Sequence, residues 1–314
     1  MSADRLDTNR QGAYQLDIIW SPVLELMTSL QVYLDRNLHK SIELGPNWAR
    51  WVAKRLGHEF KALAEETKDI YPLSLLFWHE AHGQDVEAFL DWLGALTPGE
   101  IYDLVAPDLP PDAPPMPKDL GARRDRFVAL LRAWNDGYFR RFNKLVLAGL
   151  ESDAEAKRAM LQRMKPEEVF EEATGGVVLL PSPDIKRVVL APHYHARPWN
   201  LHDRLAWGPV YQYPADVVQA QADEPSSTLL RLTRALADES RLRILRYLSR
   251  GPRTFTEIAK FSELAKSTVH YHMMLLRAAG LVRVHVSYDG PDRYSLRPGA
   301  LDKLGGRLAD FLKE

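Results

Sequence analysis

Apolar residues recur every three or four positions between residues 229 and 279, and this spacing is the strongest pattern in the chain. The stretches LLRLTRALAD (229–238) and SRLRILRYLSR (240–250) each carry leucines on one stripe, which is typical of a helix with one buried face. Residues 238–240, Asp-Glu-Ser, supply a break and a cap between them. The pattern therefore predicts two consecutive amphipathic helices.

Two further helices joined by a tight turn are predicted next. Gly251-Pro252 ends the second helix, and Thr254 or Thr256 can cap a short third one around TEIAKF. A fourth helix is predicted from residue 265 to Gly280, with Val269, Met273 and Leu276 as its buried stripe. Two short helices in this arrangement form a helix-turn-helix.

The outer face of that fourth helix carries polar side chains long enough to reach base edges in a major groove. We predict that its DNA-binding residues are Lys266, Ser267, Thr268, His270 and Tyr271. His272 has two alternatives of equal weight: it donates to a DNA phosphate, or it is a half-buried structural histidine.

A β-hairpin wing and a last helix complete this module. Apolar and polar residues alternate along VRVHVSYDGPDRYSL (282–296), with a turn at Asp289-Gly290-Pro291. Arg293, near the tip, is expected to reach a phosphate or the minor groove. The final segment places four apolar residues on one stripe, which predicts a dimerisation helix: Leu301, Leu304, Leu308 and Phe311.

Charge separates this module from the rest of the chain. Residues 226–314 hold 16 Lys or Arg against 9 Asp or Glu, a net charge of +7, whereas residues 1–225 carry a net charge of −8. The polar stretch PADVVQAQADEPSS (214–227) is the predicted linker. We therefore predict an N-terminal sensing or dimerisation domain over 1–220 and a DNA-binding domain over 226–314, the basic one facing a polyanion.

The C-terminal module resembles the winged-helix domain of ArsR-type bacterial transcriptional regulators. The similarity lies in ALADESRLRILRYL, in STVHYHMMLLRAAGLV and in the wing. The family's recognition helix typically ends in a sequence matched here by Arg277, Ala279, Gly280, Leu281 and Val282. His272 matches a family histidine, while His270 replaces the usual serine, so the base preference is expected to differ. The resemblance implies a sequence-specific regulator that binds an inverted repeat as a homodimer.

The first 215 residues are predicted to be mostly helical with a small sheet. We expect a strand at 14–20, a helix opened by Ser21-Pro22, and further helices at 48–65, 85–93 and 123–150. Six prolines in APDLPPDAPPMPK (106–118) predict a surface loop.

After residue 165 the pattern predicts a short helix and then strands. GGVVLLPSP and KRVVLAPHY are expected to form a hairpin pair, and WGPVYQYP one more strand. Aromatic residues gather in this region, at Tyr194, Trp199, Trp207, Tyr211 and Tyr213. They suit either core packing, which we favour, or a small-molecule pocket.

Three histidine pairs, two of them in the tripeptide His-Tyr-His, raise the question of a metal site. On a strand, His193 and His195 project from one face, and His202 and Asp203 follow, so a metal-dependent hydrolase is the alternative function. His79 and His82 in FWHEAH are three apart, not four, and do not match the zinc-protease motif. On a helix, residues two apart face nearly opposite sides, so the second HYH (270–272) cannot share a metal ion.

Composition excludes several mechanisms. The chain has no cysteine, which rules out disulfides, thiolate metal sites and thiol nucleophiles. No apolar run is long enough to cross a membrane and the N-terminus is polar, so we expect a cytoplasmic protein with no membrane partner. No phosphate loop, nucleophile elbow or cofactor motif occurs, and the last helix lacks histidine. We expect no enzyme and no cofactor, but a regulator, a repressor by resemblance, that does not sense metal.

Overall fold

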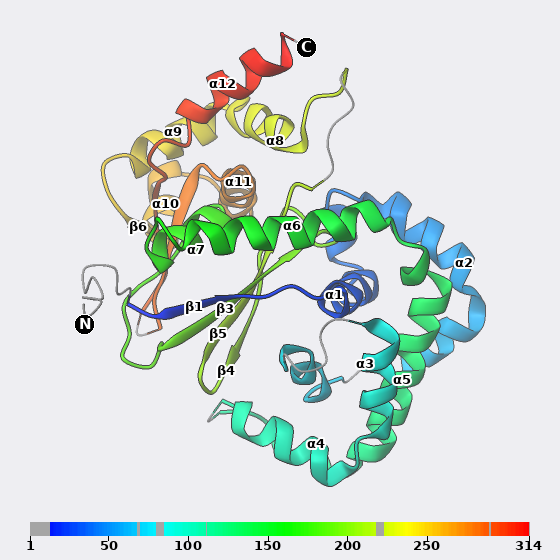
Figure 1. Cartoon of the computed structure of the whole chain (residues 1–314). Helices are drawn as coiled ribbons and strands as arrows, with labels where there is room; N and C mark the ends of the chain where they lie inside the picture. Colours follow the sequence, from blue (N-terminus) through cyan, green and yellow to red (C-terminus); the bar gives the residue numbers. More distant parts are fainter. Residues whose placement is uncertain are drawn as a thin grey trace, which may run out of the picture. The chain divides into compact units, whose positions relative to one another are not determined.

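The computed structural model describes residues 13–67, 70–79, 85–110, 112–217, 223–288 and 290–313, and it divides into two compact units (Figure 1). Unit 1 comprises residues 1–16, 157–186 and 216–314, and unit 2 comprises residues 17–156 and 187–215. The division therefore differs from the predicted boundary near 220, since residues 157–186 belong with the C-terminal module. The centre of the predicted linker, 218–222, lies outside the described residues.

Unit 2 is mainly helical and contains a large apolar core. Ser21 caps its first helix by accepting the N–H of Val23, with Pro22 at the first helical position, as predicted. The α-helices of this part of the chain are α1 (Pro22–Leu34), α2 (Gly45–Glu66), α3 (Val86–Ala95), α4 (Pro98–Val105), α5 (Leu120–Gly137) and α6 (Lys144–Met160), the last crossing into unit 1. Short 3₁₀ turns lie at Leu38–Lys40, Leu73–Trp78, Ala106–Asp108 and Phe139–Arg141.

The single long helix predicted over 123–150 is wrong. Helix α5 ends at Gly137, a 3₁₀ turn follows, and α6 begins only at Lys144. The side chain of Asn143 accepts the N–H of Leu145, which starts the second helix on a new axis. Apolar periodicity continues through the break because both helices contribute residues to the same core, for example Leu131 of α5 and Leu147 of α6.

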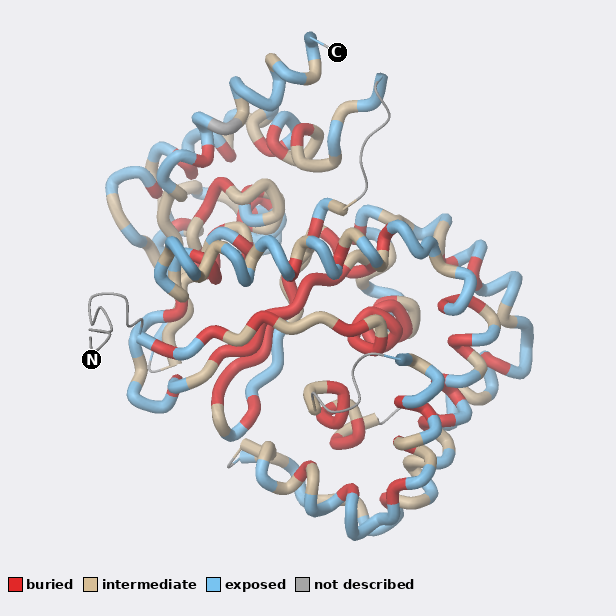
Figure 2. Tube along the Cα trace, in the orientation of Figure 1, coloured by how far each residue is buried: buried red, intermediate tan, exposed pale blue. Residues whose placement is uncertain are grey.

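A four-stranded sheet runs in the order β1 (Gln15–Ile18), β3 (Arg187–His193), β5 (Gly208–Pro214), β4 (Leu201–Leu205). Strand β3 is parallel to β5, whereas β4 and β5 form an antiparallel hairpin. Strands β3 and β5 are buried along almost their whole length, as their red colour in Figure 2 shows.

The predicted pairing of GGVVLLPSP with KRVVLAPHY is also wrong. Strand β2 (Val177–Leu179) pairs in parallel with β7 (Val282–Val286), with Val177 opposite Val284. Strand β3 belongs to the other sheet. Pro181 and Pro183 separate the two segments, and proline lacks the N–H that a continuing antiparallel ladder needs.

The rest of unit 1 is the predicted winged helix-turn-helix preceded by helix α7 (Pro166–Ala173) and β2. It contains α8 (Ser227–Leu236), α9 (Glu239–Leu248), β6 (Arg253–Thr254), α10 (Phe255–Ser262), α11 (Lys266–Ala278), β7, β8 (Arg293–Leu296) and α12 (Asp302–Phe311). The predicted stripes form its core. The caps are Ser226, Asp238 and Thr254, each accepting a backbone N–H of the first turn. The predicted fold class, mostly helical with small sheets, is confirmed. None of the described helices is long and apolar enough to cross a membrane.

Candidate nucleic-acid interface

Helix α11 is held in place by its buried stripe. Val269, Met273 and Leu276 are 0%, 3% and 0% exposed and pack against the core of the module. The turn before it contains Glu263, whose left-handed backbone (φ 57°) ends α10 and lets α11 leave at a new angle. The opposite face of α11 is therefore fixed in orientation and open to solvent.

That open face carries the predicted DNA-binding residues, all of which are exposed: Lys266, Ser267, Thr268, His270 and Tyr271. Tyr271 is 53% exposed, an unusual position for a large ring without a binding partner. All five lie in the first two turns of the helix, where unpaired backbone N–H groups also favour a phosphate.

His272 lies on the other side of the helix and is 7% exposed. Its Nδ1 lies 3.4 Å from Nη1 of Arg241, itself buried, which donates further bonds to the carbonyl oxygens of Ala235 (2.7 Å) and Arg234 (2.8 Å) at the end of α8. The structure therefore favours the second alternative for His272: it links α11 to Arg241 and the end of α8, and its burial does not fit a phosphate donor.

The wing is a regular hairpin in which Val282 faces Leu296 and His285 faces Arg293. His285 Nε2 lies 2.8 Å from Ser295 Oγ, and burial and the nearby Arg283 lower the pKa of His285. Arg293 is exposed and has no ion-pair partner among the described residues. Its contact with DNA stays a prediction, and Asp289 of the turn lies outside the described residues.

Residues 171–179 contribute to the wing, which the sequence pattern did not indicate. Glu171 accepts hydrogen bonds from Arg283 Nε (2.6 Å) and Nη2 (2.9 Å), and Glu172 accepts one from Arg297 Nη2 (2.6 Å). Gly176 accepts the N–H of Val284, and a Cβ at Gly176 would lie 2.8 Å from the carbonyl oxygen of Val282. Arg283 and Arg297 are thus paired with carboxylates of the same unit. In the sequence, only the two glycines before VVLL could have indicated that another strand approaches the backbone so closely.

Helix α12 presents part of the predicted dimerisation stripe to solvent. Leu301 and Leu308 are 44% and 41% exposed, while Leu304 packs against the core of the module and Phe311 is half-buried. Its role in dimerisation stays a prediction.

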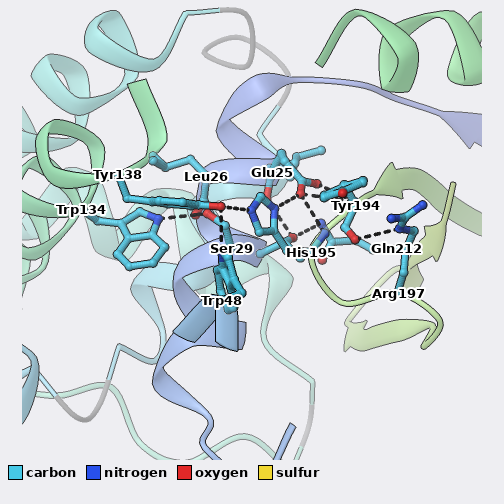
Figure 3. Close-up of polar contacts among 12 residues, drawn as sticks. Glu25, Leu26, Ser29, Trp48, Trp134, Tyr138, Tyr194, His195, Arg197 and Gln212 are labelled. Carbon is cyan, nitrogen blue, oxygen red and sulfur yellow. Dashed lines mark hydrogen bonds and ion pairs between the residues drawn. The ribbon is translucent and has the colours of Figure 1, made fainter. Parts of the chain in front are cut away.

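His195 of the first histidine pair is part of a buried polar network in unit 2 (Figure 3). His195 lies past the end of β3; its Nδ1 contacts the carboxylate of Glu25 and its Nε2 lies 2.7 Å from the hydroxyl of Tyr138. Glu25 also accepts the backbone N–H groups of Tyr194 and His195, and Trp48 donates to Tyr138. Burial is the main cause that raises the pKa of Tyr138, so its hydroxyl stays protonated.

His193 is fully buried, and Nε2 lies 2.8 Å from the carbonyl oxygen of Trp199, to which it donates. Burial lowers its pKa to about 4. Within the part of the chain that the structure describes, its Nδ1 has no hydrogen-bond partner.

These contacts do not fit the proposed alternative of a metal-dependent hydrolase. His202 and Asp203 lie on β4, where the His202 ring stacks on Tyr211 at 5.3 Å. No group of three or more His, Asp or Glu side chains within the described residues could hold a metal ion. His79 lies 3.5 Å from Asp108, and His82 is outside the described residues. Sequence spacing had placed His193 and His195 on one face, but the strand ends between them.

Comparison with known proteins agrees with this assignment of the C-terminal module. Residues 236–285 match the model of a family described as a helix-turn-helix domain. No curated protein sequence matches the chain significantly.

Three solved structures are similar to a part of the chain. An ArsR family transcriptional regulator is 28% identical over 28% of this chain and 94% of its own, with a TM-score of 0.25. NolR from Sinorhizobium fredii is 25% identical over 25% of this chain and 79% of its own (TM-score 0.22), and HlyU from Vibrio cholerae is 26% identical over 25% and 86% (TM-score 0.22). The C-terminal module is a winged helix-turn-helix domain similar to that of ArsR-type regulators, and the similarity concerns that part of the chain alone.

Proposed function

We propose that this chain, built around a winged helix-turn-helix domain of the ArsR type, is a sequence-specific DNA-binding transcriptional regulator. The observation that carries the proposal is the open face of α11, where Lys266, Ser267, Thr268, His270 and Tyr271 are exposed over a stripe of fully buried apolar residues. A rigid helix with donors and acceptors on its free face suits insertion into a major groove. Its site of action is then the cytoplasm, where bacterial DNA lies.

In the proposed complex the protein binds an inverted repeat as a homodimer. The exposed Leu301 and Leu308 of α12 supply an apolar contact surface for a second copy. A two-fold pair would place the two α11 helices in successive major grooves, about 34 Å apart. Arg293 of each wing would contact the flanking backbone.

We further propose that the protein is a repressor that a small molecule, not a metal, controls through the N-terminal part of the chain. The absence of cysteine supports a non-metal signal, because thiolate sensing is excluded. Control requires that the ligand bind the DNA-competent and DNA-incompetent states with different affinity.

The test is selection of bound DNA from a random duplex library with the full-length protein at fixed physiological salt. Enrichment of an inverted repeat is the expected result, and it identifies the operator for a reporter assay of repression. No enriched motif, together with salt-dependent binding to every duplex, would refute sequence-specific regulation.

A further inference from the structure

Unit 2 contains a cleft of about 800 Å³ that lies between the C-terminal end of helix α1 and helix α2 and extends along α2. This volume lies within the range of roughly 300–1,000 Å³ that is typical of small-molecule sites. Every described residue that lines the cleft lies between Gln31 and Ile70 in the sequence. The cleft is therefore a feature of this unit alone, and neither the DNA-binding face nor the buried Glu25 network opens into it.

The cleft exists because helix α2 presents small residues to it. Ala49, Ala53 and Ala64 line the cleft, and so does Gly57, at which the backbone leaves helical geometry (φ +72°, ψ −170°). Only glycine adopts such a conformation readily, so this position bends the helix at the middle of the cleft. Larger side chains at the alanine positions would fill the space.

The inner wall of the cleft is apolar and aromatic. Tyr33 and Leu34 line it from α1, and Phe60, which is 4% exposed, lines it from α2. The Tyr33 and Phe60 rings pack edge to face at 5.9 Å, and Tyr33 also packs against Trp134 at 4.9 Å. Contacts on both sides hold the wall in place, so it offers a preformed surface for a hydrocarbon or an aromatic ring.

The charged residues that line the cleft give it a small excess of positive charge. Arg36, Arg50 and Lys61 line it, and neither Arg36 nor Lys61 has an ion-pair partner among the described residues. The carboxylates of Asp35 and Glu65 also line the cleft, and Asp35 keeps its charge while it accepts the backbone N–H of Asn37, so the three cations exceed the two anions by one. An apolar wall with unpaired cations beside it is complementary to a molecule that has an apolar body and an anionic head group.

We propose that this cleft binds an amphipathic organic anion, a carboxylic acid on an aliphatic or aromatic body, and that this molecule is the effector of the regulator. The second half of the proposal rests on the proposed function; the first half does not. The apolar body would pack on Tyr33 and Phe60, and the carboxylate would pair with Arg36 and Lys61.

A chain of ring contacts connects the cleft with the buried polar network. Tyr33 and His39 line the cleft, and their rings pack on Trp48 at 6.2 Å and 6.4 Å. Trp48 in turn donates to Tyr138 (2.9 Å), which is bonded to His195. A ligand that packs on Tyr33 and His39 would therefore contact two rings that hold Trp48 in place.

The test is calorimetric titration of the full-length protein with decanoate, compared with decyltrimethylammonium as a probe of equal length and opposite charge. We expect one decanoate per chain and no binding of the cation. An Arg36→Gln/Lys61→Gln double variant should weaken decanoate binding by about tenfold or more, and Ala53→Leu, which narrows the cleft, should abolish it. Lys54→Gln is the matched control, because Lys54 is an exposed cation on the same helix that does not line the cleft.

Equal decanoate affinity in the wild type, the double variant and Ala53→Leu would overturn the site, provided that thermal melting shows all variants folded. Tighter binding of the cation than of decanoate would overturn the ligand class. The selected operator, titrated with and without decanoate, separates the two proposals. Decanoate binding without any operator would refute the regulator and leave the site, whereas an operator without decanoate binding would refute the site and leave the regulator.

Discussion

Glu171 and Arg283 form a bidentate ion pair, with Glu171 Oε1 and Oε2 lying 2.6 Å and 2.9 Å from Arg283 Nε and Nη2. The pair joins the end of helix α7 to the first strand of the wing, and the parallel β2–β7 ladder runs beside it. The edge of the wing that a free winged helix would expose is thus covered by residues more than a hundred positions earlier in the chain.

We predict that Glu171→Gln reduces the free energy of unfolding by about 1–2 kcal/mol. The loss comes from a charge-assisted, two-point contact in which the Arg283 side chain is one-third exposed, so solvent limits its size. Urea unfolding followed by circular dichroism measures it. Glu155→Gln, on an exposed position of α6, should change stability by less than about 0.5 kcal/mol; equal losses in the two variants would contradict a role for this pair.

The pKa of His193 makes stability depend on pH. Burial lowers that pKa from 6.5 to about 4, so between these values the unfolded chain takes up a proton that the folded chain does not. Stability should therefore fall as pH decreases from about 6.5 to about 4, by up to about 3 kcal/mol, and should not change through this group above pH 7. Denaturant midpoints at a series of pH values check the slope. The slope should be smaller in His193→Gln and unchanged in His202→Gln, whose side chain is exposed.

Tyr271→Ala should weaken binding to the selected operator by about 1–3 kcal/mol and relax the base preference. The reason is that Tyr271 is exposed on the face of α11 that we propose enters the major groove. Titration of operator and scrambled duplexes by fluorescence anisotropy distinguishes the effects, and equal losses on both duplexes would falsify its role as a base reader.

Arg293→Ala should act differently, because a phosphate contact carries no sequence information. We expect weaker binding to operator and scrambled DNA alike, with a salt slope smaller by about one. Affinities at three salt concentrations give the slope. An unchanged slope with a lost base preference would instead place Arg293 on a base edge.

Arg241→Ala should destabilise the DNA-binding module by about 2–4 kcal/mol. The guanidinium satisfies two carbonyl oxygens at the end of α8 and contacts His272, and its loss leaves these buried acceptors without a donor. Thermal melting checks it, with exposed Arg243→Ala as the control. If Arg241→Ala melts like the wild type, the contact between α8 and α11 does not depend on this side chain.

Leu308→Glu tests the α12 surface. Leu308 is 41% exposed, so the charge costs little in the monomer but would be buried in the proposed dimer. Sedimentation should show monomers for Leu308→Glu and dimers for the wild type and for Lys260→Glu, an exposed position on α10. If the Leu308→Glu variant remains dimeric, the dimer interface does not include this surface of α12.

The parts of the fold that sequence predicts well are those fixed by local chemistry. Ser21-Pro22, Asp238 and Thr254 cap helices because their side chains bond backbone groups only two or three positions away. Strand pairing is not local: Val177 pairs with Val284, and nothing in either segment specifies its partner. The candidate site divides in the same way. The apolar stripe in the sequence of α11 was enough to separate exposed Tyr271 from buried Val269. The contact of His272 with Arg241 could not be predicted in this way, because it forms only when the helices of the module pack together.

The β2–β7 pair also means that the DNA-binding module is assembled from two distant parts of one polypeptide. If the chain were cut between residues 186 and 216, the two fragments would still carry matching halves of a parallel ladder, two Glu–Arg pairs and a glycine shaped for close approach. Such fragments should associate when they are mixed, and recovery of operator binding would measure this complementation. We therefore expect the segment that ends in β2 to complete the wing when it is supplied as a separate chain.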